Sequence, residues 1–135
     1  MEKYKFLDEI TSDVMFEAYG SDLREVFVNA AEALFTVICH NVSGNEEREV
    51  SVKGKDTDEL MFNWLQELIA TVDIEEMFFW RFEILEISET ALRAKIYGEP
   101  ITREKGETVV KSLTLHKYKF EKTSDGYITR ISCDI

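Results

Sequence analysis

Carboxylates near both ends of the chain are the residues best suited to carry chemistry. Asp13 opens a predicted strand, with Asp8 and Glu9 shortly before it, and Asp134 stands next to the carboxyl end of Ile135. Three carboxylates converge if the last strand pairs beside the strand that starts at Asp13. Divalent cations such as Ca²⁺, Mg²⁺ and Mn²⁺ prefer several oxygen ligands, and clustered anions repel one another without a cation. We interpret these residues as a candidate metal site; a turn cap at Asp13 and a solvated terminus at Asp134 are the alternatives that spacing leaves open.

The two histidines are weaker candidates. His40 follows Cys39 at the end of a predicted helix, and a soft-metal pair there lacks two further ligands, so a histidine that helps to end the helix is favoured. His116 lies in a predicted strand, on the same strand face as Thr114 and Tyr118. A general base, a metal ligand and a hydrogen-bonded histidine on a sheet face all fit that position.

Glycine spacing excludes the common nucleotide-binding loops. The six glycines stand at positions 20, 44, 54, 98, 106 and 126, so no two are closer than eight residues. A phosphate-binding loop needs two glycines five apart, and a dinucleotide-binding loop needs them two and three apart. The motifs H-E-x-x-H, C-x-x-C and G-x-S-x-G are absent as well. These absences weigh against a metal-dependent hydrolase, which is one reading of the same carboxylates.

Composition and charge narrow the class of protein further. The chain has 135 residues, of which 44% are hydrophobic, and it shows no linker or repeat, so we expect one domain over residues 1–135. A net charge of −11 argues against direct, strong nucleic-acid binding, because phosphates are bound by many Lys and Arg. Residues 91–135 carry nine basic and six acidic side chains. Either a local basic surface or lysines that protect strand edges would explain that excess.

The sequence predicts a cytoplasmic protein that does not enter a membrane. The opening MEKYKFLDE is charged and lacks the apolar region of a signal peptide, and no apolar stretch approaches the roughly 18–20 residues of a membrane span. Because no export signal is seen, Cys39 and Cys133 are interpreted as two reduced thiols, with a single disulfide as the alternative.

Hydrophobic periodicity predicts two helices among seven strands. Asp22 with Glu25, and Asp56 with Glu59, have the spacing of a capping box, and apolar residues recur at helical spacing after each pair. The expected helices cover residues 23–38 and 57–72, and the expected strands cover 4–7, 14–19, 49–53, 80–87, 91–97, 109–120 and 127–134. This order predicts an α+β fold, with two main helices packed on one face of a mostly antiparallel or mixed β-sheet.

Two local irregularities are expected within the strands. The alternation of the strand that begins at Trp80 slips at Leu85, which predicts a bulge. The segment Ser124-Asp125-Gly126 is a typical hairpin signal between the last two strands.

An ordered set of short motifs resembles the archease family. The first is Thr11-Ser12-Asp13-Val14, followed by EAYG at residues 17–20 and the alanine-rich NAAEALF at residues 29–35. The later motifs are NWLQEL at residues 63–68, YGEP at 97–100, VKSLTLH at 110–116 and the terminal CDI at 133–135. The resemblance spans nearly the whole chain. It departs from the family pattern at Ile10, where the family commonly has a histidine, and at Leu115, where it has an aromatic residue.

The resemblance implies an accessory protein, and not an enzyme acting alone. Archeases are partners of RtcB-type RNA ligases, which join RNA ends in tRNA splicing and RNA repair, and they promote guanylylation of the ligase by GTP and metal and sustain multiple turnover. Carried over by position, Asp13, Asp134 and the carboxyl end of Ile135 match the metal-binding residues of the family, with Ca²⁺ as the expected ion and Mg²⁺ or Mn²⁺ as alternatives. Lys111 matches a lysine on which activity depends, and it would contact the partner or a phosphate. His116 is an auxiliary candidate.

Other classes of function remain open at this point. Archeases have also been proposed to modulate RNA methyltransferases, which implies a chaperone-like binding module acting on an RNA-modifying enzyme. A subunit of a purely structural oligomer is a further alternative.

Overall fold

The computed structural model describes residues 2–7 and 13–135 of the chain. The strands are β1 (Tyr4–Leu7), β2 (Asp13–Gly20), β3 (Glu46–Lys53), β4 (Met77–Ile87), β5 (Ala91–Pro100), β6 (Ser112–Thr123) and β7 (Gly126–Asp134). The helices are α1 (Leu23–Ile38) and α2 (Thr57–Glu75), and a short 3₁₀ turn, η1 (Arg103–Lys105), follows β5. Neither α1 nor α2 has the length and hydropathy that a membrane-spanning helix requires.

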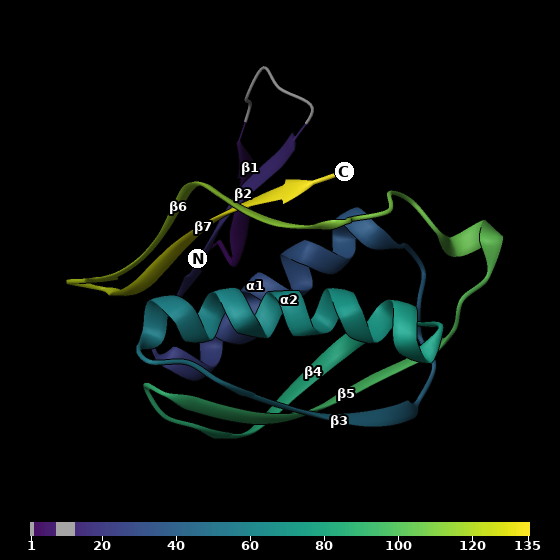
Figure 1. Ribbon diagram of the computed structural model, residues 1–135, viewed down its shortest axis with the longest axis horizontal. Helices are drawn as coiled ribbons and strands as arrows, with labels where there is room; N and C mark the ends of the chain where they lie inside the picture. The colour runs from purple at the N-terminus through teal and green to yellow at the C-terminus, as the bar shows by residue number, and fades with distance from the viewer. Residues whose placement is uncertain (1, 8–12) are drawn as a thin grey trace.

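The strands form two separate sheets with the helices between them (Figure 1). One sheet has the order β1-β2-β7-β6 and the other the order β3-β5-β4, and all their pairings are antiparallel. The predicted α+β class, with two main helices and antiparallel strands, is confirmed. The sequence prediction placed both helices on one face of a single sheet. In the structure, each helix packs against both sheets.

Helix α1 shows why two sheets can share the same helices. Its buried residues lie around most of its circumference: Val26, Phe27, Asn29, Ala30, Ala31, Ala33, Leu34, Phe35 and Ile38. A helix that is apolar on nearly all sides is stable only where it is covered on nearly all sides. The three alanines leave room for close approach of neighbouring backbones, so a sheet can pack on either side of α1.

Both predicted capping boxes are present. The Asp22 side chain accepts a hydrogen bond from the Glu25 backbone N–H at 2.8 Å, and the Asp56 side chain accepts one from Glu59 at 2.9 Å. The Glu25 carboxylate accepts in return from the backbone N–H of Ser21 at 2.9 Å. These bonds satisfy N–H groups that the first turn of a helix leaves unpaired, so the start of each helix is set by residues three apart.

Several boundaries differ from the sequence prediction. The predicted bulge at Leu85 is confirmed, since the register shifts between Ile84 and Glu86, and the β6–β7 hairpin turns before Gly126 at φ 140°. Helix α2 continues to Glu75, three residues beyond its predicted end. Strand β6 begins only at Ser112, because the preceding residues turn away to cover the end of α1, where the Thr108 N–H donates to the Val37 carbonyl at 3.1 Å.

Candidate metal centre

The first long strand and the last strand pair at the ends that carry the candidate carboxylates. Strands β2 and β7 are antiparallel neighbours, and Asp13 lies directly opposite Asp134 in their register. Side chains of directly opposed residues emerge on the same face of a sheet, with Cβ atoms about 4.5–5.5 Å apart. The convergence on which the metal hypothesis depends is therefore present between the two aspartates, although these residues are 121 positions apart in the chain.

Both aspartates face away from the helices. Along β2 and β7, Phe16, Ile131 and Cys133 are buried in the core that contacts the helices. Because side chains alternate between the faces of a strand, Asp13 and Asp134 point to the opposite, outer face. Each is only partly buried. A cation held there would keep access to water, as oxygen-ligated cations commonly require.

Lys111 lies at the same edge of the sheet. Its backbone N–H donates to the carbonyl of Asp134 at 2.8 Å, and the next residue, Ser112, is the register partner of Asp134 on β6. The Lys111 side chain is exposed. Ile135 follows Asp134 directly, and its side chain is 37% exposed. The structure thus brings four of the sequence-predicted site residues to one edge of the four-stranded sheet.

The donor set fits a hard cation. Within residues 2–7 and 13–135, no group of three or more His, Cys, Asp or Glu side chains is arranged to hold a metal. The aspartate pair supplies two carboxylates. Asp8 and Glu9, which the sequence analysis also considered, lie outside the described residues, as does Ile10. Two like charges on directly opposed positions destabilise a sheet, and a divalent cation between them would offset that cost.

The prediction that His116 shares a strand face with Thr114 and Tyr118 is wrong. The register of β6 against β7 shifts between Thr114 and Lys119, and Lys117 adopts a φ of 53°. Tyr118 turns toward α2, where its ring packs against the ring of Phe62 with 5.5 Å between the ring centroids. An irregularity of this size breaks the alternation on which the prediction rested.

The same irregularity places the His116 backbone on the outer face. The Ser132 hydroxyl donates to the His116 carbonyl at 2.8 Å, and Ser132 is two residues before Asp134 on the same face of β7. The auxiliary role of His116 remains a prediction, with its main chain anchored near the aspartate pair.

The Cys39–His40 pair does not have the character of a metal site. Burial raises the pKa of the Cys39 thiol to about 12, and the His40 side chain is engaged by Glu107 and not by the sulfur. The His40 side chain contacts Glu107 at 2.7 Å, and its backbone N–H donates to the Lys105 carbonyl at 2.9 Å. His40 therefore helps to attach the loop before β6 to the end of α1, while the backbone N–H that caps the helix is that of Cys39.

Both thiols should resist alkylation in the folded protein. Cys39 and Cys133 are free and buried, and burial raises the pKa of each to about 12, with the nearby Asp13 charge adding to the effect at Cys133. At pH 8 about one thiol in ten thousand is then ionised. We expect a thiol reagent to modify neither residue in the native state and both residues in denaturant, as counted by mass spectrometry. Rapid native labelling of either cysteine would contradict this.

Gln66 is a positioning residue whose role the sequence analysis did not recognise. It belongs to the NWLQEL segment of α2, and its side-chain oxygen accepts a hydrogen bond from the backbone N–H of Leu113 at 2.8 Å. Leu113 is buried and lies next to Ser112, the neighbour of Asp134. The bond holds the start of β6 against α2. A glutamine within a helical amphipathic pattern gives no sign of a backbone partner 47 residues away.

Replacing Gln66 by leucine should lower the free energy of unfolding by about 1–3 kcal/mol, because the buried Leu113 N–H would lose its acceptor. The matched variant Gln66→Glu keeps an acceptor oxygen and should stay within about 0.5 kcal/mol of the wild type. Urea unfolding measures both. Equal stability of the leucine and glutamate variants would show that this bond is unimportant.

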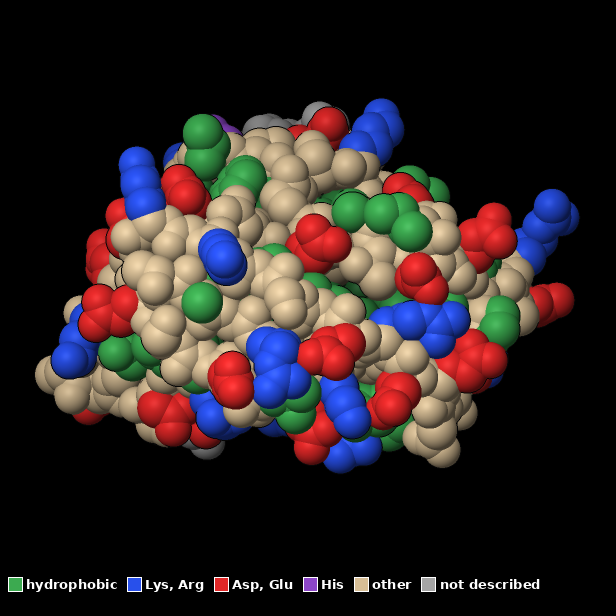
Figure 2. Space-filling model, turned by 60° about the horizontal axis from the view of Figure 1, so that its bottom comes forward, with side chains coloured by type: hydrophobic (Ala, Val, Ile, Leu, Met, Phe, Trp, Pro, Cys, Tyr) green, Lys and Arg blue, Asp and Glu red, His purple; other side chains and the backbone are tan. Residues whose placement is uncertain are grey.

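Three of the basic residues in the C-terminal third lie beside carboxylates. Arg130 bonds to Glu17 at 3.2 Å, Arg93 to Glu49 at 2.9 Å, and Lys95 lies 3.8 Å from Glu47. Figure 2 shows basic and acidic side chains interleaved over the lower part of this face. Local neutralisation of this kind leaves little field to attract a polyanion.

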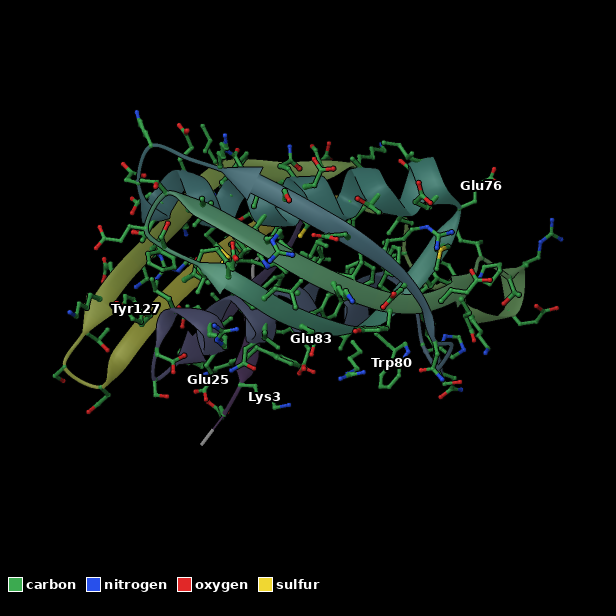
Figure 3. All side chains as sticks on the ribbon, turned by 90° about the horizontal axis from the view of Figure 1, so that it is seen from below. Lys3, Glu25, Glu76, Trp80, Glu83 and Tyr127 are labelled. Atoms are coloured by element: carbon green, nitrogen blue, oxygen red, sulfur yellow. The ribbon has the colours of Figure 1, made fainter. Side chains whose placement is uncertain are left out.

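A groove of about 590 Å³ lies away from the aspartates, between α1 and β4. Its lining includes Phe35, Phe82 and Trp80. The Trp80 indole N–H donates to the Gly44 carbonyl at 2.6 Å, so this side chain links the residues just before β3 to β4. Figure 3 shows Trp80 near one end of the three-stranded sheet, far from Tyr127 in the β6–β7 hairpin.

Comparison with known proteins places the chain in a family. The model of the Archease protein family (MTH1598/TM1083) matches residues 4–135. The chain belongs to the archease family. A protein archease of Methanosarcina acetivorans is 38% identical to it, over 99% of this chain and 97% of the relative. A protein archease of Pyrococcus abyssi is 42% identical, over 87% of this chain and 88% of the relative.

Solved structures agree with this archease fold. The solution structure of Methanobacterium thermoautotrophicum protein 1598 has a TM-score of 0.81 and 32% identity, with each chain covered in full. The crystal structure of an archease from Thermotoga maritima, described as a possible chaperone, has a TM-score of 0.65 over 94% of this chain and 92% of that one. At 22% identity, the second comparison bears on the fold alone. The family resemblance predicted from the sequence motifs is confirmed.

Proposed function

We propose that this archease activates an RtcB-type RNA ligase by promoting its metal- and GTP-dependent guanylylation, so that the ligase turns over repeatedly. The observation that supports this proposal most directly is the opposition of Asp13 and Asp134 at the edge of the four-stranded sheet. The ligase is the partner that the resemblance to the archease family implies, and the absence of nucleotide-binding and nucleophile motifs from the sequence supports an accessory role.

Asp13, Asp134 and the carboxyl end of Ile135 would hold the cation in this proposal, with Ca²⁺ as the expected ion and Mg²⁺ or Mn²⁺ as alternatives. A divalent cation there would supply positive charge against the triphosphate of GTP, which is the usual role of metals in nucleotidyl and phosphoryl transfer. The protein orients the two carboxylates through the β2–β7 register and leaves both side chains partly exposed to solvent. Lys111, exposed at the same edge, would contact a phosphate or a carboxylate of the partner.

The excess acidity of the chain suits a ligase partner. A cleft that holds RNA must be basic, and complementary charge accelerates association between proteins more than it tightens the final complex. With a net charge of −11, this archease would be attracted to such a cleft and repelled by free RNA. This charge supports the ligase as the proposed partner, and we expect no strong direct binding of nucleic acid.

The test uses purified ligase with GTP, metal and an excess of RNA ends. A substoichiometric amount of this protein should raise the amount of RNA joined per ligase well above one turnover. No stimulation by the folded protein would overturn the proposal.

A chaperone-like modulator of an RNA-modifying enzyme, such as a tRNA methyltransferase, is the second candidate function. The resemblance to the archease family implies this role as well. A chaperone would suppress aggregation of its client stoichiometrically and would not depend on the aspartate pair, so the two functions differ in both stoichiometry and mutant response.

A further inference from the structure

A row of charged side chains crosses the outer face of the four-stranded sheet. The strand registers place Lys5 opposite Glu17, Glu17 opposite Arg130, and Arg130 opposite Lys119, on β1, β2, β7 and β6 in turn. Directly opposed residues emerge on the same face of a sheet, and Glu17 alternates with the buried Phe16, so the row shares its face with the aspartate pair. The sheet lies on the opposite side of α2 from the three-stranded sheet (Figure 1). We call Lys5, Arg130 and Lys119 the basic row.

The carboxylate beside the basic row is already engaged by its neighbours. Oε2 of Glu17 accepts hydrogen bonds from Nε and Nη2 of Arg130, both at 3.2 Å, and Oε1 accepts one from the Tyr19 hydroxyl at 3.1 Å. Within the described residues, neither Lys5 nor Lys119 forms an ion pair. Three cations against one carboxylate leave a local charge of +2, in a chain whose net charge is −11. Positive charge without a protein partner is therefore concentrated on this face.

The opposition of Lys119 and Arg130 costs stability, because like charges on directly opposed positions repel each other. The aspartate pair has the same cost with the opposite sign. Asp134 follows Arg130 by four residues on β7, which is roughly 13 Å at about 3.3 Å per residue. The outer face thus opposes like charges twice, and local departures from favourable chemistry are expected at functional sites. A ligand that combines a cation with several anionic oxygens would offset both costs.

Protection of the sheet edges does not explain the whole row. Lys5 and Lys119 lie on β1 and β6, which are edge strands, and edge lysines discourage pairing with other chains. That role requires no second cation, whereas Lys119 lies opposite Arg130 of the inner strand β7. Lys122 provides the comparison, because it is an exposed lysine of the same edge strand that lies opposite the uncharged Tyr127.

The irregular stretch of β6 lies between the basic row and the aspartate pair. Ser132 stands midway on β7, two residues after Arg130 and two before Asp134, and its hydroxyl donates to the His116 carbonyl at 2.8 Å. Ser132 is fully buried, so this bond fixes the main chain of His116 beside the middle of the face. The His116 side chain is exposed, and an imidazole N–H can donate to an anion. An anion that extends from the basic row toward the aspartate pair would therefore pass beside His116.

We propose that the basic row binds the phosphate groups of a nucleoside triphosphate. This inference rests on the proposed function and adds to it that the activator itself holds part of the GTP. Lys and Arg are the usual protein contacts of phosphate, and divalent cations in nucleotide sites are bound by one or two carboxylates together with phosphate oxygens. Lys5 and Lys119 contact the phosphates, while Arg130 stays paired with Glu17 and adds to the local positive charge. The aspartate pair would hold the divalent cation that accompanies the nucleotide.

The charge of the whole chain favours a short anion over a long one. Charges on the surface are screened over roughly 8–10 Å at physiological salt, so a triphosphate on the basic row interacts mainly with nearby lysines. An RNA strand extends beyond the row and meets the acidic remainder of a chain with a net charge of −11. The ligand class is therefore a nucleotide and not a nucleic acid.

The test measures binding by the free protein, without the ligase. GTP and inorganic tripolyphosphate, each with Mg²⁺, are titrated by calorimetry into the wild type, into Lys5→Gln/Lys119→Gln and into Lys122→Gln. The wild type should bind both probes with Kd values within about threefold, because the row contacts phosphates and not the base. The double variant should raise both Kd values tenfold or more. The matched control Lys122→Gln loses the same charge from the other face of β6 and should change them less than twofold. Circular dichroism checks that each variant is folded.

The outcomes separate the basic row from the activator function. Wild-type affinity in the folded double variant, or no binding of either probe by the wild type, would overturn the row and leave ligase activation standing. Equally tight binding of a short single-stranded RNA that displaces GTP would also overturn it, because the row would then serve nucleic acid. Binding that the double variant loses, in a protein that does not stimulate the ligase, would support the row and overturn the proposed function.

Discussion

Replacing Asp13 or Asp134 by asparagine should lower the maximal stimulation of ligase guanylylation at least tenfold. Asparagine keeps the shape of the side chain but removes a charge, and divalent cations are bound chiefly by charged carboxylates. The loss should persist at saturating concentrations of the variant, because the residues act on the bound partner and not on attachment. The measurement is the plateau of guanylylated ligase against added protein. The matched control Asp125→Asn changes the same charge in the β6–β7 hairpin, at the other end of β7, and should stimulate fully.

A stability measurement checks the same residues without the ligase. The wild type should gain free energy of unfolding when Ca²⁺ is added, by about 2.7 kcal/mol at a concentration of 100 times the Kd. Asp134→Asn should gain little, and without metal it should be at least as stable as the wild type, since like charges on opposed strand positions cost about 0.2–1 kcal/mol. Full stimulation by a folded Asp134→Asn protein, or an equal response to Ca²⁺, would contradict the assignment.

Replacing Trp64 by alanine should lower the free energy of unfolding by about 3–5 kcal/mol, close to the limit that a domain of this size tolerates. Trp64 is fully buried on α2, and its indole N–H donates to the carbonyl of Phe27 on α1 at 3.0 Å. The truncation leaves a cavity between the two helices and removes the bond that joins them. Thermal and urea unfolding measure the loss.

Trp64→Phe separates the two contributions. Phenylalanine fills much of the volume of tryptophan but cannot donate a hydrogen bond to the Phe27 carbonyl. We therefore expect the free energy of unfolding of this variant to lie between those of the alanine variant and the wild type. The NWLQEL segment that resembles the family motif would then be a structural element, with Trp64 joining the helices and Gln66 holding β6. An alanine variant that loses less than about 1 kcal/mol would refute this reading.

Only part of the candidate site could be predicted from the sequence. The residue types and their family positions singled out Asp13, Asp134 and Lys111, and the structure brings them to one edge of the sheet. The surroundings of His116 were misjudged because a regular strand was assumed, and the register shift in β6 reverses which side chains share a face. The groove lined by Ile69, Val72 and Phe78 was not predicted, since its walls come from α1, α2, β4 and the loop after β5, which no local pattern relates.

The sequence by itself determined the local structure of this protein. Helix starts follow from the pairs Asp22–Glu25 and Asp56–Glu59, and the helices from apolar spacing, because hydrogen bonds and contacts within a helix join residues three or four apart. The hairpin before Gly126 likewise depends on neighbouring residues.

Only the tertiary structure decided which strands are neighbours and how many sheets they form. The pairing of β2 with β7 joins residues as distant as Asp13 and Asp134, 121 positions apart. Such pairing depends on burying both faces of the two helices between two sheets at once, and every alternating strand in the chain satisfies the local pattern equally well. The aspartate pair exists because that global packing set the register in which Asp13 meets Asp134.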